Sequence, residues 1–377
     1  MSHKSGLFQW MALVSRHLPQ LSKSQAVTLA LFSFGMVMTR RCGMTTVTHF
    51  LALLTGKTPG SLRQRLREWC YDAPDKRGAG RQEIDVTASF APLLRWIIDW
   101  WQAGEHQLVL ALDATSLRQT FTVLAVSVVY RGCAIPVAWT IVPASAAGSW
   151  QAPWLGLLAL LRPAVPKQWR VLVLTDRGLY ARWLFSAIRQ HGWHPFMRIN
   201  RQGQYRRRRA QHWQPLQALI PPQGQVWAGR VVCFKSADCQ LPCTLLACWQ
   251  PTYADAWLIV TDLPVTQAQI ACYGWRAWIE AGFKDFKRGG WRWEQTKMTR
   301  PERAERLWLV MAVATLWSLA VGGYADGMAF PLLVADKRVL SCFVQGLNTI
   351  LVAALRHQPL PTPGFIPDFQ NKAPLLC

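Results

Sequence analysis

Four apolar runs between residues 107 and 176 decide the fold: QLVLALD (107–113), FTVLAVSVVY (121–130), CAIPVAWTIVP (133–143) and WRVLVLTD (169–176). Each run is apolar or alternating and is bounded by a short break, so each predicts a β-strand. The breaks between the first three are too short for a helix and predict hairpins. The fourth run follows WLGLLALL, within residues 149–161, which predicts a helix.

The pattern continues past residue 176 with a helix around ARWLFSAIRQHG (181–192) and a strand in PFMRIN (195–200). The full order is therefore β-β-β-α-β-α-β. Three hairpin-linked strands followed by α/β crossovers are the topology of the ribonuclease H fold, so we expect an α/β protein with a core of this kind. This is a fold-level analogy and carries no chemistry by itself.

The remaining segments divide the chain into five predicted regions. Residues 1–100 are a helical region, and residues 101–200 are the first part of the ribonuclease H-like core. Residues 201–265 alternate short strands with Pro/Gly turns, so we expect a small β-rich insertion that interrupts the core. Residues 266–325 complete the core with a long helix that Thr266 is expected to cap and Gly289-Gly290 to end. Residues 326–377 form a C-terminal helical region and tail.

The composition is strongly basic, with 42 Lys and Arg against 20 Asp and Glu and a formal net charge of +22. Such a chain repels itself unless a polyanion neutralises it, so nucleic acid is the favoured partner and a membrane surface the second. The ten cysteines are scattered, and the first residues lack the layout of a signal peptide. We therefore expect a reducing, intracellular compartment.

One apolar stretch, LWLVMAVATLWSLAVGG (307–323), has 17 residues without a charge. Its length is just under that of a membrane-spanning helix. It follows the charged run RPERAER and contains several small residues, so we interpret it as a buried core helix and expect no membrane contact.

The N-terminal region contains a pair of helices around a Gly/Pro turn. Residues 45–54 are an apolar helix, the sequence GKTPG breaks it, and Ser61 is expected to cap a second helix that carries Arg63 and Arg67. Two such helices predict either a helix-turn-helix that reads the DNA major groove or a helical bundle with a basic surface.

Two acids close apolar strands of the predicted core. Asp113 ends VLALD, and Asp176 ends VLVLTD. Functional groups of open α/β sheets collect at the carboxyl ends of strands, and in this topology the two strands would be neighbours. Like charges held so close need a cation between them, and oxygen ligands favour magnesium or manganese. Each Asp taken alone is equally well a turn or cap residue.

The long helix after residue 266 carries a polar stripe. Its members lie three or four residues apart and cover an arc of about 80° on an α-helix. They are Tyr273, Arg276, Glu280, Lys284 and Lys287. A solvated face supported by ion pairs such as Glu280–Lys284 is the alternative. If the stripe faces the two aspartates, Glu280 completes a metal site and the cations suit flanking phosphates.

Tyr273, Arg276, Glu280 and Lys287 have the spacing of the Y-R-E-K signature of bacterial DDE transposases, in particular the insertion sequence four group. Asp113-Ala-Thr115 and Asp176-Arg177-Gly178 are similar to the group's other two motifs. The resemblance runs from about residue 107 to 325.

The resemblance implies a DNA transposase in which Asp113, Asp176 and Glu280 are catalytic and bind two Mg²⁺ ions, with Mn²⁺ as a substitute. It implies excision and strand transfer of an insertion sequence by a two-metal mechanism. It also implies double-stranded DNA partners, namely terminal inverted repeats and target DNA, and a homodimer in a synaptic complex. No small-molecule substrate is expected, and the location would be the bacterial cytoplasm beside the nucleoid.

Further DNA contacts are predicted outside the stripe. Trp257 has a place similar to the family's stacking tryptophan, although an ordinary sheet core residue would look the same. The arginine run Arg206, Arg207, Arg208 and Arg209 predicts a DNA-facing loop or a solvated charge run. Cys233, Cys239, Cys243 and Cys248 lack the paired spacing of a zinc ribbon, so we interpret them as buried strand residues.

Two other classes of function stay open on the sequence. One is a non-catalytic DNA-binding derivative of a transposase, and the other is a ribonuclease H-fold nuclease without strand transfer. The presence of all three acids argues against the first, because a protein without catalysis has no chemical need for them.

Overall fold

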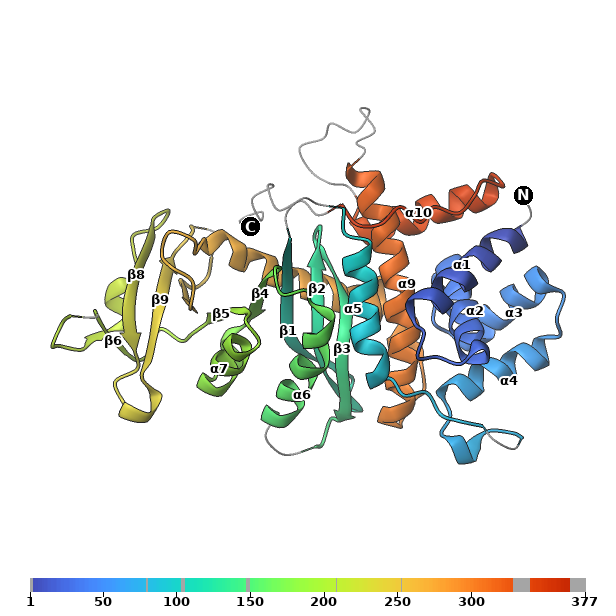
Figure 1. Cartoon of the computed structure of the whole chain (residues 1–377), viewed down its shortest axis with the longest axis horizontal. Coiled ribbons are helices and arrows are strands. Elements are labelled where there is room, and N and C mark those ends of the chain that lie inside the picture. Colours follow the sequence, from blue (N-terminus) through green and yellow to red (C-terminus); the bar gives the residue numbers. More distant parts are fainter. Residues whose placement is uncertain are drawn as a thin grey trace.

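The structure, a computed structural model of the chain, describes residues 3–78, 81–102, 106–146, 150–207, 209–251, 253–327 and 340–366. Within these residues a single ten-stranded sheet runs through the molecule in the order β3-β2-β1-β4-β5-β10-β9-β8-β6-β7. Figure 1 shows the N-terminal helices at one end of the elongated molecule and strands β6, β8 and β9 at the other.

The first half of the sheet is the predicted ribonuclease H-like core. Its strands are β1 (Gln107–Leu117), β2 (Phe121–Tyr130), β3 (Cys133–Pro143), β4 (Arg170–Thr175) and β5 (His194–Arg198). The helices α6 (Gln151–Leu161) and α7 (Arg182–Gln190) form the crossovers that bring β4 beside β1 and β5 beside β4, both in parallel. The predicted α/β fold class and the order β-β-β-α-β-α-β are confirmed.

The second half of the sheet comes from the predicted insertion. Its strands are β6 (Gln204–Arg207), β7 (Gln214–Pro215), β8 (Val226–Cys233), β9 (Leu241–Cys248) and β10 (Trp257–Thr261). The strands of the predicted β-rich insertion continue the core sheet, because β10 pairs antiparallel with β5 at Ile259↔Arg198 and Val260↔Met197. The edge of β5 would otherwise leave backbone N–H and C=O groups unpaired, and β10 satisfies them.

A single long helix, α9 (Pro301–Gly327), contains the apolar stretch noted in the sequence. It meets the length and hydropathy of a membrane span, and 94% of that apolar window is buried inside the protein. It packs against β3, α2 and α10 (Cys342–Leu355), with Trp308 and Trp317 fully buried. The prediction of a buried core helix is confirmed.

The N-terminal region is helical, as predicted. It contains α1 (His3–His17), α2 (Lys23–Thr39), α3 (Met44–Thr55), α4 (Pro59–Cys70) and α5 (Phe90–Asp99). The helix pair α3–α4 surrounds the expected turn, but Thr58 rather than Ser61 caps α4, because the Thr58 hydroxyl accepts from Ser61 N and Pro59 then begins the helix. Whether this pair reads DNA bases stays a prediction.

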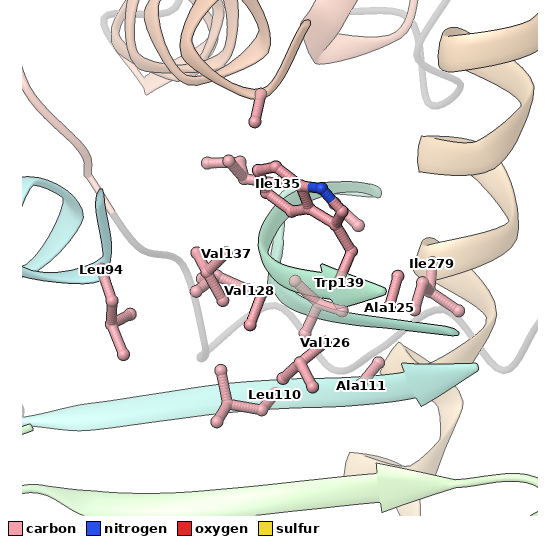
Figure 2. Packing of buried hydrophobic residues seen from close by; sticks show 14 of the residues in the cluster. Leu94, Leu110, Ala111, Ala125, Val126, Val128, Ile135, Val137, Trp139 and Ile279 are labelled. Atoms are coloured by element: carbon pink, nitrogen blue, oxygen red, sulfur yellow. The ribbon is translucent and has the colours of Figure 1, made fainter. Parts of the chain in front are cut away.

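The sheet and helices share one core at β1, β2 and β3. Figure 2 shows Ile279 beside Ala125 of β2, with Trp139 of β3 above Val126. Ile279 belongs to α8 (Trp278–Lys284), which packs across β1, β2 and β3. A side chain at Gly282 would collide with Ala134 of β3, so this glycine lets α8 approach the sheet closely. That approach fixes the position of Glu280 in the candidate site.

Candidate active site

The two candidate aspartates lie where strands β1 and β4 part. Asp176 directly follows β4, as predicted. Asp113 was predicted to end its strand, but β1 continues to Leu117 because its antiparallel pairing with β2 extends that far. The parallel pairing of β1 with β4 does stop one residue before Asp113, at Leu112↔Thr175. The two carboxylates therefore lie at the same edge, although only one of them ends a strand.

Asp176 also serves as a cap. Its Oδ1 accepts a hydrogen bond of 3.1 Å from Leu179 N and so closes the short 3₁₀ turn Arg177–Leu179. Its other oxygen, Oδ2, lies 3.6 Å from Arg276 Nη2, and its side chain is 37% exposed. The cap and the functional interpretations of Asp176 are therefore compatible, since each uses a different carboxylate oxygen.

The segment that carries the polar stripe is not one regular α-helix. It consists of a 3₁₀ turn (Ile270–Ala277), the two-turn helix α8 and a π-helical turn (Asp285–Gly289). The predicted cap at Thr266 is wrong, because the helical segment begins after Gln269, and Gln269 makes no side-chain cap. The predicted end at Gly289-Gly290 is correct. Short 3₁₀ and π segments often mark functional sites, where they re-aim individual side chains.

Arg276 joins all three candidate acids. Its Nη2 donates to Asp113 Oδ2 at 2.7 Å and lies 3.6 Å from Asp176 Oδ2, while its Nη1 donates to Glu280 Oε1. The structure thus brings together acids from β1, from the end of β4 and from α8 around one guanidinium. The stripe does face the aspartates, but its arginine lies in the middle of the acidic cluster.

The electrostatics of this cluster are set by Asp113 and Arg276, whose side chains are each only 15% exposed. Burial raises the pKa of Asp113 to about 6, against the opposing effects of Arg276 and the Ala114 amide. Burial alone would lower the pKa of Arg276, but the carboxylates and the nearby Tyr273 hydroxyl outweigh it and the pKa is raised. Arg276 is therefore a permanent cation that holds Asp113 in its ionised form near neutral pH.

A cleft of about 510 Å³ opens beside the acids. Its basic lining residues are Lys284, Lys287 and Arg288, and its acidic ones are Asp113 and Glu280. Lys287 Nζ donates to Thr115 Oγ1 at 2.6 Å, which ties the last turn of the stripe to β1. Arg288 was missed by sequence reasoning, although its position next to Lys287 could have indicated it. The cleft therefore combines an acidic centre with a basic rim.

Trp257 lies close to this site through Tyr273. The Trp257 ring meets the Tyr273 ring edge-on, with centroids 5.0 Å apart, and stacks against Tyr253 at 4.4 Å. Tyr273 itself is buried, and burial raises its pKa well above the usual range. Because the Trp257 ring stacks on Tyr253, one of its faces is already covered, and no sequence pattern indicates this contact. Tyr253 is a second residue that sequence reasoning missed.

The other predicted DNA contacts are spread over the surface. Arg206 and Arg207 lie in strand β6 rather than in a loop, and the Arg206 guanidinium lies over the Trp213 ring at 5.4 Å. Arg209 is exposed, and Arg208 falls outside the described residues. In the N-terminal region Arg63 and Arg67 are exposed on one side of α4. None of these five described positions lines the cleft beside the three acids.

The three acids can be tested as ligands for a divalent cation. In the described part of the chain, no group of three or more His, Cys, Asp or Glu is assembled closely enough to hold a metal. The donor chemistry nevertheless fits: three carboxylates, hard oxygen ligands, already share one cation, the Arg276 guanidinium. The residues present suit the ion, and Arg276 stands between them.

Comparisons with known proteins assign the chain to a family. A family model described as a transposase DDE domain matches residues 105–317, more than half of the chain. Among solved structures, the chain is similar to a piggyBac transposase in a synaptic complex with hairpin DNA, at 10% identity and a TM-score of 0.38. The match covers 94% of this chain and 80% of that one. No curated protein sequence matches the chain.

Proposed function

Because the chain belongs to the family of transposases with a DDE domain, we propose that it excises a DNA element and joins the element to new DNA by metal-dependent phosphoryl transfer. The observation that carries the proposal is the meeting of Asp113, Asp176 and Glu280 on one cation. Three separate segments deliver these acids to the edge of the sheet where α/β proteins collect their functional groups. The insertion sequence four group is the finer assignment that the Y-R-E-K spacing favours.

The carboxylates of Asp113, Asp176 and Glu280 are the groups that would hold two Mg²⁺ ions, with Mn²⁺ as the alternative. Bound ions of this kind activate a water or a DNA 3′-hydroxyl and stabilise the leaving oxygen. Asp113 supplies the least exposed carboxylate, and its link to the Ala114 amide at 2.8 Å fixes its orientation. Glu280 is 61% exposed and so can adjust its position more freely.

The cations of the site would bind the DNA phosphates around the reacting bond. Lys287 is positioned by Thr115, Lys284 and Arg288 line the same cleft, and Arg276 lies at its acidic end. Preorganised cations lower the free energy of a transition state in which negative charge builds up on phosphate oxygens. The net charge of +22 favours the same partner, double-stranded DNA, which would include terminal repeats and target. A homodimer that pairs two element ends completes the proposal.

The experiment uses a supercoiled plasmid that carries the genomic DNA flanking the coding sequence on both sides, incubated with the full chain and Mg²⁺. Wild type should release the element and join it to a second plasmid. Asp113→Asn should lower both products by at least about a thousandfold, because the neutral amide cannot hold a divalent cation as a carboxylate does. Asp238→Asn, at an exposed acid in the 3₁₀ turn Ala237–Cys239, is the matched control and should keep full activity.

Three results would contradict the proposal or narrow it. Equal products from wild type and Asp113→Asn would exclude the carboxylate site. DNA binding without any cleavage, in either metal, would favour a non-catalytic derivative. Cleavage without joining would favour a nuclease of the same fold.

A further inference from the structure

A second cleft lies between the N-terminal helices and the start of α9. It is distinct from the catalytic cleft. It has a volume of about 760 Å³ and is lined on one side by residues of α3 and α4 and on the other by residues 292–307. The cations of the helical side are Arg41, Arg63 and Arg67. Those of the opposite side are Arg292, Lys297, Arg300 and Arg303. We call this cleft the basic groove.

The charges of the basic groove are only partly neutralised. Asp72 and Asp75 pair with Arg300 and Arg303 at 2.7–3.1 Å. The other cations, Arg41, Arg63, Arg67, Arg292 and Lys297, have no acid within 4.0 Å in the described part of the chain. The described lining residues include neither Asp nor Glu. Placing unopposed cations together costs free energy through repulsion, so such a groove suits a ligand with several negative charges.

The groove is also built to hold its cations in place. Tyr71 is the centre of this arrangement: Arg67 donates to its hydroxyl at 2.6 and 3.0 Å, and Arg303 lies over its ring at 4.3 Å. One arginine from α4 and one from α9 are thereby oriented by the same aromatic side chain. Ordered guanidinium groups lose less conformational entropy when they bind phosphate, which favours a specific site over a diffuse patch.

The backbone at Arg292 has a conformation that is unfavourable for residues other than glycine. Its φ is +58°, in the left-handed region, and it lies between Trp291 and Trp293, which are both fully buried. Such a conformation costs a non-glycine residue about 1 kcal/mol. The two buried neighbours fix the backbone at this point, and Arg292 then lines the groove. Outliers of this kind concentrate at binding sites.

The basic groove is close to the catalytic cleft along the chain. Arg288 lines the cleft, and Arg292 lines the groove. The backbone between them is anchored, because Cys42 N donates to Trp291 O at 2.8 Å and Trp291 Nε1 donates to Thr315 Oγ1 at 2.8 Å. The N-terminal helices and the catalytic segment are therefore held in a fixed relation at this point.

We propose that the basic groove binds the sugar–phosphate backbone of the DNA whose reacting end lies in the catalytic cleft. The inference rests on the proposed function and adds a binding site to it. The hydroxyl groups of Thr45 and Thr46 in the lining supply neutral donors from which phosphate oxygens accept hydrogen bonds, alongside the cations. Contacts of this type position DNA without reading its sequence, so α4 forms one side of a site that holds the sugar–phosphate backbone of the DNA.

The test measures equilibrium binding of a fluorescent 30-base-pair DNA duplex by anisotropy at several salt concentrations, without divalent cations. All proteins carry Asp113→Asn, so binding is scored independently of cleavage. The triple variant Arg41→Gln, Arg292→Gln, Lys297→Gln should lower affinity about 10- to 100-fold near 0.1 M salt. Its slope of log affinity against log salt should fall by about 3, since each lost phosphate contact removes about 0.9.

The matched control removes the same charge elsewhere. Arg95, Lys167 and Lys235 are exposed cations outside the groove, and their triple Gln variant should change the slope by less than 1. Equal losses in the two triple variants, or an unchanged slope in the groove variant, would overturn the proposal. So would a groove variant that loses binding to anionic vesicles but keeps its binding to DNA. Arg63→Gln alone, at an exposed side chain, should lower the slope by about 1 and repeats the test if the triple variant misfolds.

Failure of the groove and failure of the proposed function give different results. A groove variant with normal DNA binding overturns this inference but leaves cleavage by wild type intact. The absence of Asp113-dependent cleavage would overturn the catalytic proposal, but it would not affect the dependence of DNA affinity on salt concentration.

Discussion

The proposed catalytic cleft and the basic groove are separated by only three residues of chain, 289–291, yet the balance of charge at their centres is opposite. At the acidic centre of the cleft, inside its basic rim, one guanidinium, Arg276, contacts three carboxylates, so negative charge is in excess there. In the groove seven cations face the same space and acids pair with only Arg300 and Arg303, so negative charge is scarce. The acidic centre of the cleft therefore suits additional cations, whereas the basic groove suits an anion. Under the proposed function, DNA with its divalent ions would provide both.

Because of this difference in charge, the cleft should affect the stability of the folded protein, whereas the groove should affect the binding of its ligand. An internal ion pair contributes to folding only when its partner is present, and its loss leaves an uncompensated buried charge. An unopposed surface cation contributes nothing to folding and repels its neighbours. Substitutions in the two regions should therefore change different quantities.

The largest effect is expected at Arg276. Arg276→Ala leaves three carboxylates with no shared partner, two of which are largely buried or half-buried, and should lower the free energy of unfolding by about 3 kcal/mol. Urea denaturation at pH 7.5 without divalent ions measures this loss. Millimolar Mg²⁺ or Mn²⁺ should restore part of the lost stability in the variant.

Arg63→Ala is the matching change in the groove. It should leave the free energy of unfolding within about 0.5 kcal/mol of wild type, because its exposed side chain has no acidic partner in the described part of the chain. If both variants lose the same stability, the contrast between cleft and groove is wrong.

A second effect concerns Asp285, a buried acid without an arginine partner among the described residues. Burial raises the pKa of Asp285 to about 7, against the opposing effect of Lys284. The unfolded state loses this proton near pH 4, whereas the folded state keeps it until about pH 7. Its contribution to stability is therefore full below about pH 4 and is lost as the pH rises through 7.

Asp285→Asn should remove that pH dependence. At pH 8 the variant should be more stable than wild type by about 2–3 kcal/mol, and near pH 4 the two should be equal. Thermal melts across this range provide the measurement. A difference that is constant with pH would mean that the carboxyl is ionised in the folded protein throughout.

A third effect, on the cleavage rate, is expected at Lys287 at the rim of the cleft. Lys287→Met removes both the hydrogen bond to Thr115 and the positive charge, and should lower the cleavage rate about thirtyfold. Thr115→Val removes the hydrogen bond alone and should lower the rate about threefold. Single-turnover cleavage with saturating DNA separates the two, and equal losses would show that the charge itself does not matter.

The smallest effect is expected at the aromatic cluster beside Tyr273. Trp257→Leu should lower cleavage about fivefold if an extruded base stacks on the Trp257 ring, since such stacking contributes about 1 kcal/mol or more. Tyr253→Leu uncovers that ring and should leave cleavage near the wild-type rate. Fluorescence of 2-aminopurine at the terminal base reports whether a base leaves the duplex in each variant.

The strands of the core could be predicted from the sequence because their signals are local. Periodicity and breaks identified β1 to β5 and the two crossover helices, and topology then placed Asp113 next to Asp176. The continuation of the sheet through β10 could not be predicted, since strand pairing depends on which backbone edge is left free. The end of β1 was misjudged for the same reason: its pairing with β2 continues to Leu117 after its pairing with β4 stops.

The candidate site was predictable in its residue types but not in its geometry. The spacing of Tyr273, Arg276, Glu280 and Lys287 picked out the stripe, yet an ideal α-helix was assumed where the chain changes from 3₁₀ to α to π. The position of Arg276 among the acids depends on that change. Only one side of the basic groove could be predicted. Arg63 and Arg67 were identified from the sequence of α4, whereas the cations on the opposite side lie more than 220 residues later in the chain.

Helix α9 has a consequence for synthesis of the chain on the ribosome. Its apolar window has a mean hydropathy of 1.6, enough for a nascent segment to be mistaken for one bound for a lipid bilayer. Its partners α2 and β3 are translated long before it, so much of its apolar surface can be covered as soon as it emerges. Among the described elements that pack against it, α10 is translated later. The order of elements along the chain thus shortens the time for which the most hydrophobic helix is accessible to targeting factors and to other unfinished chains.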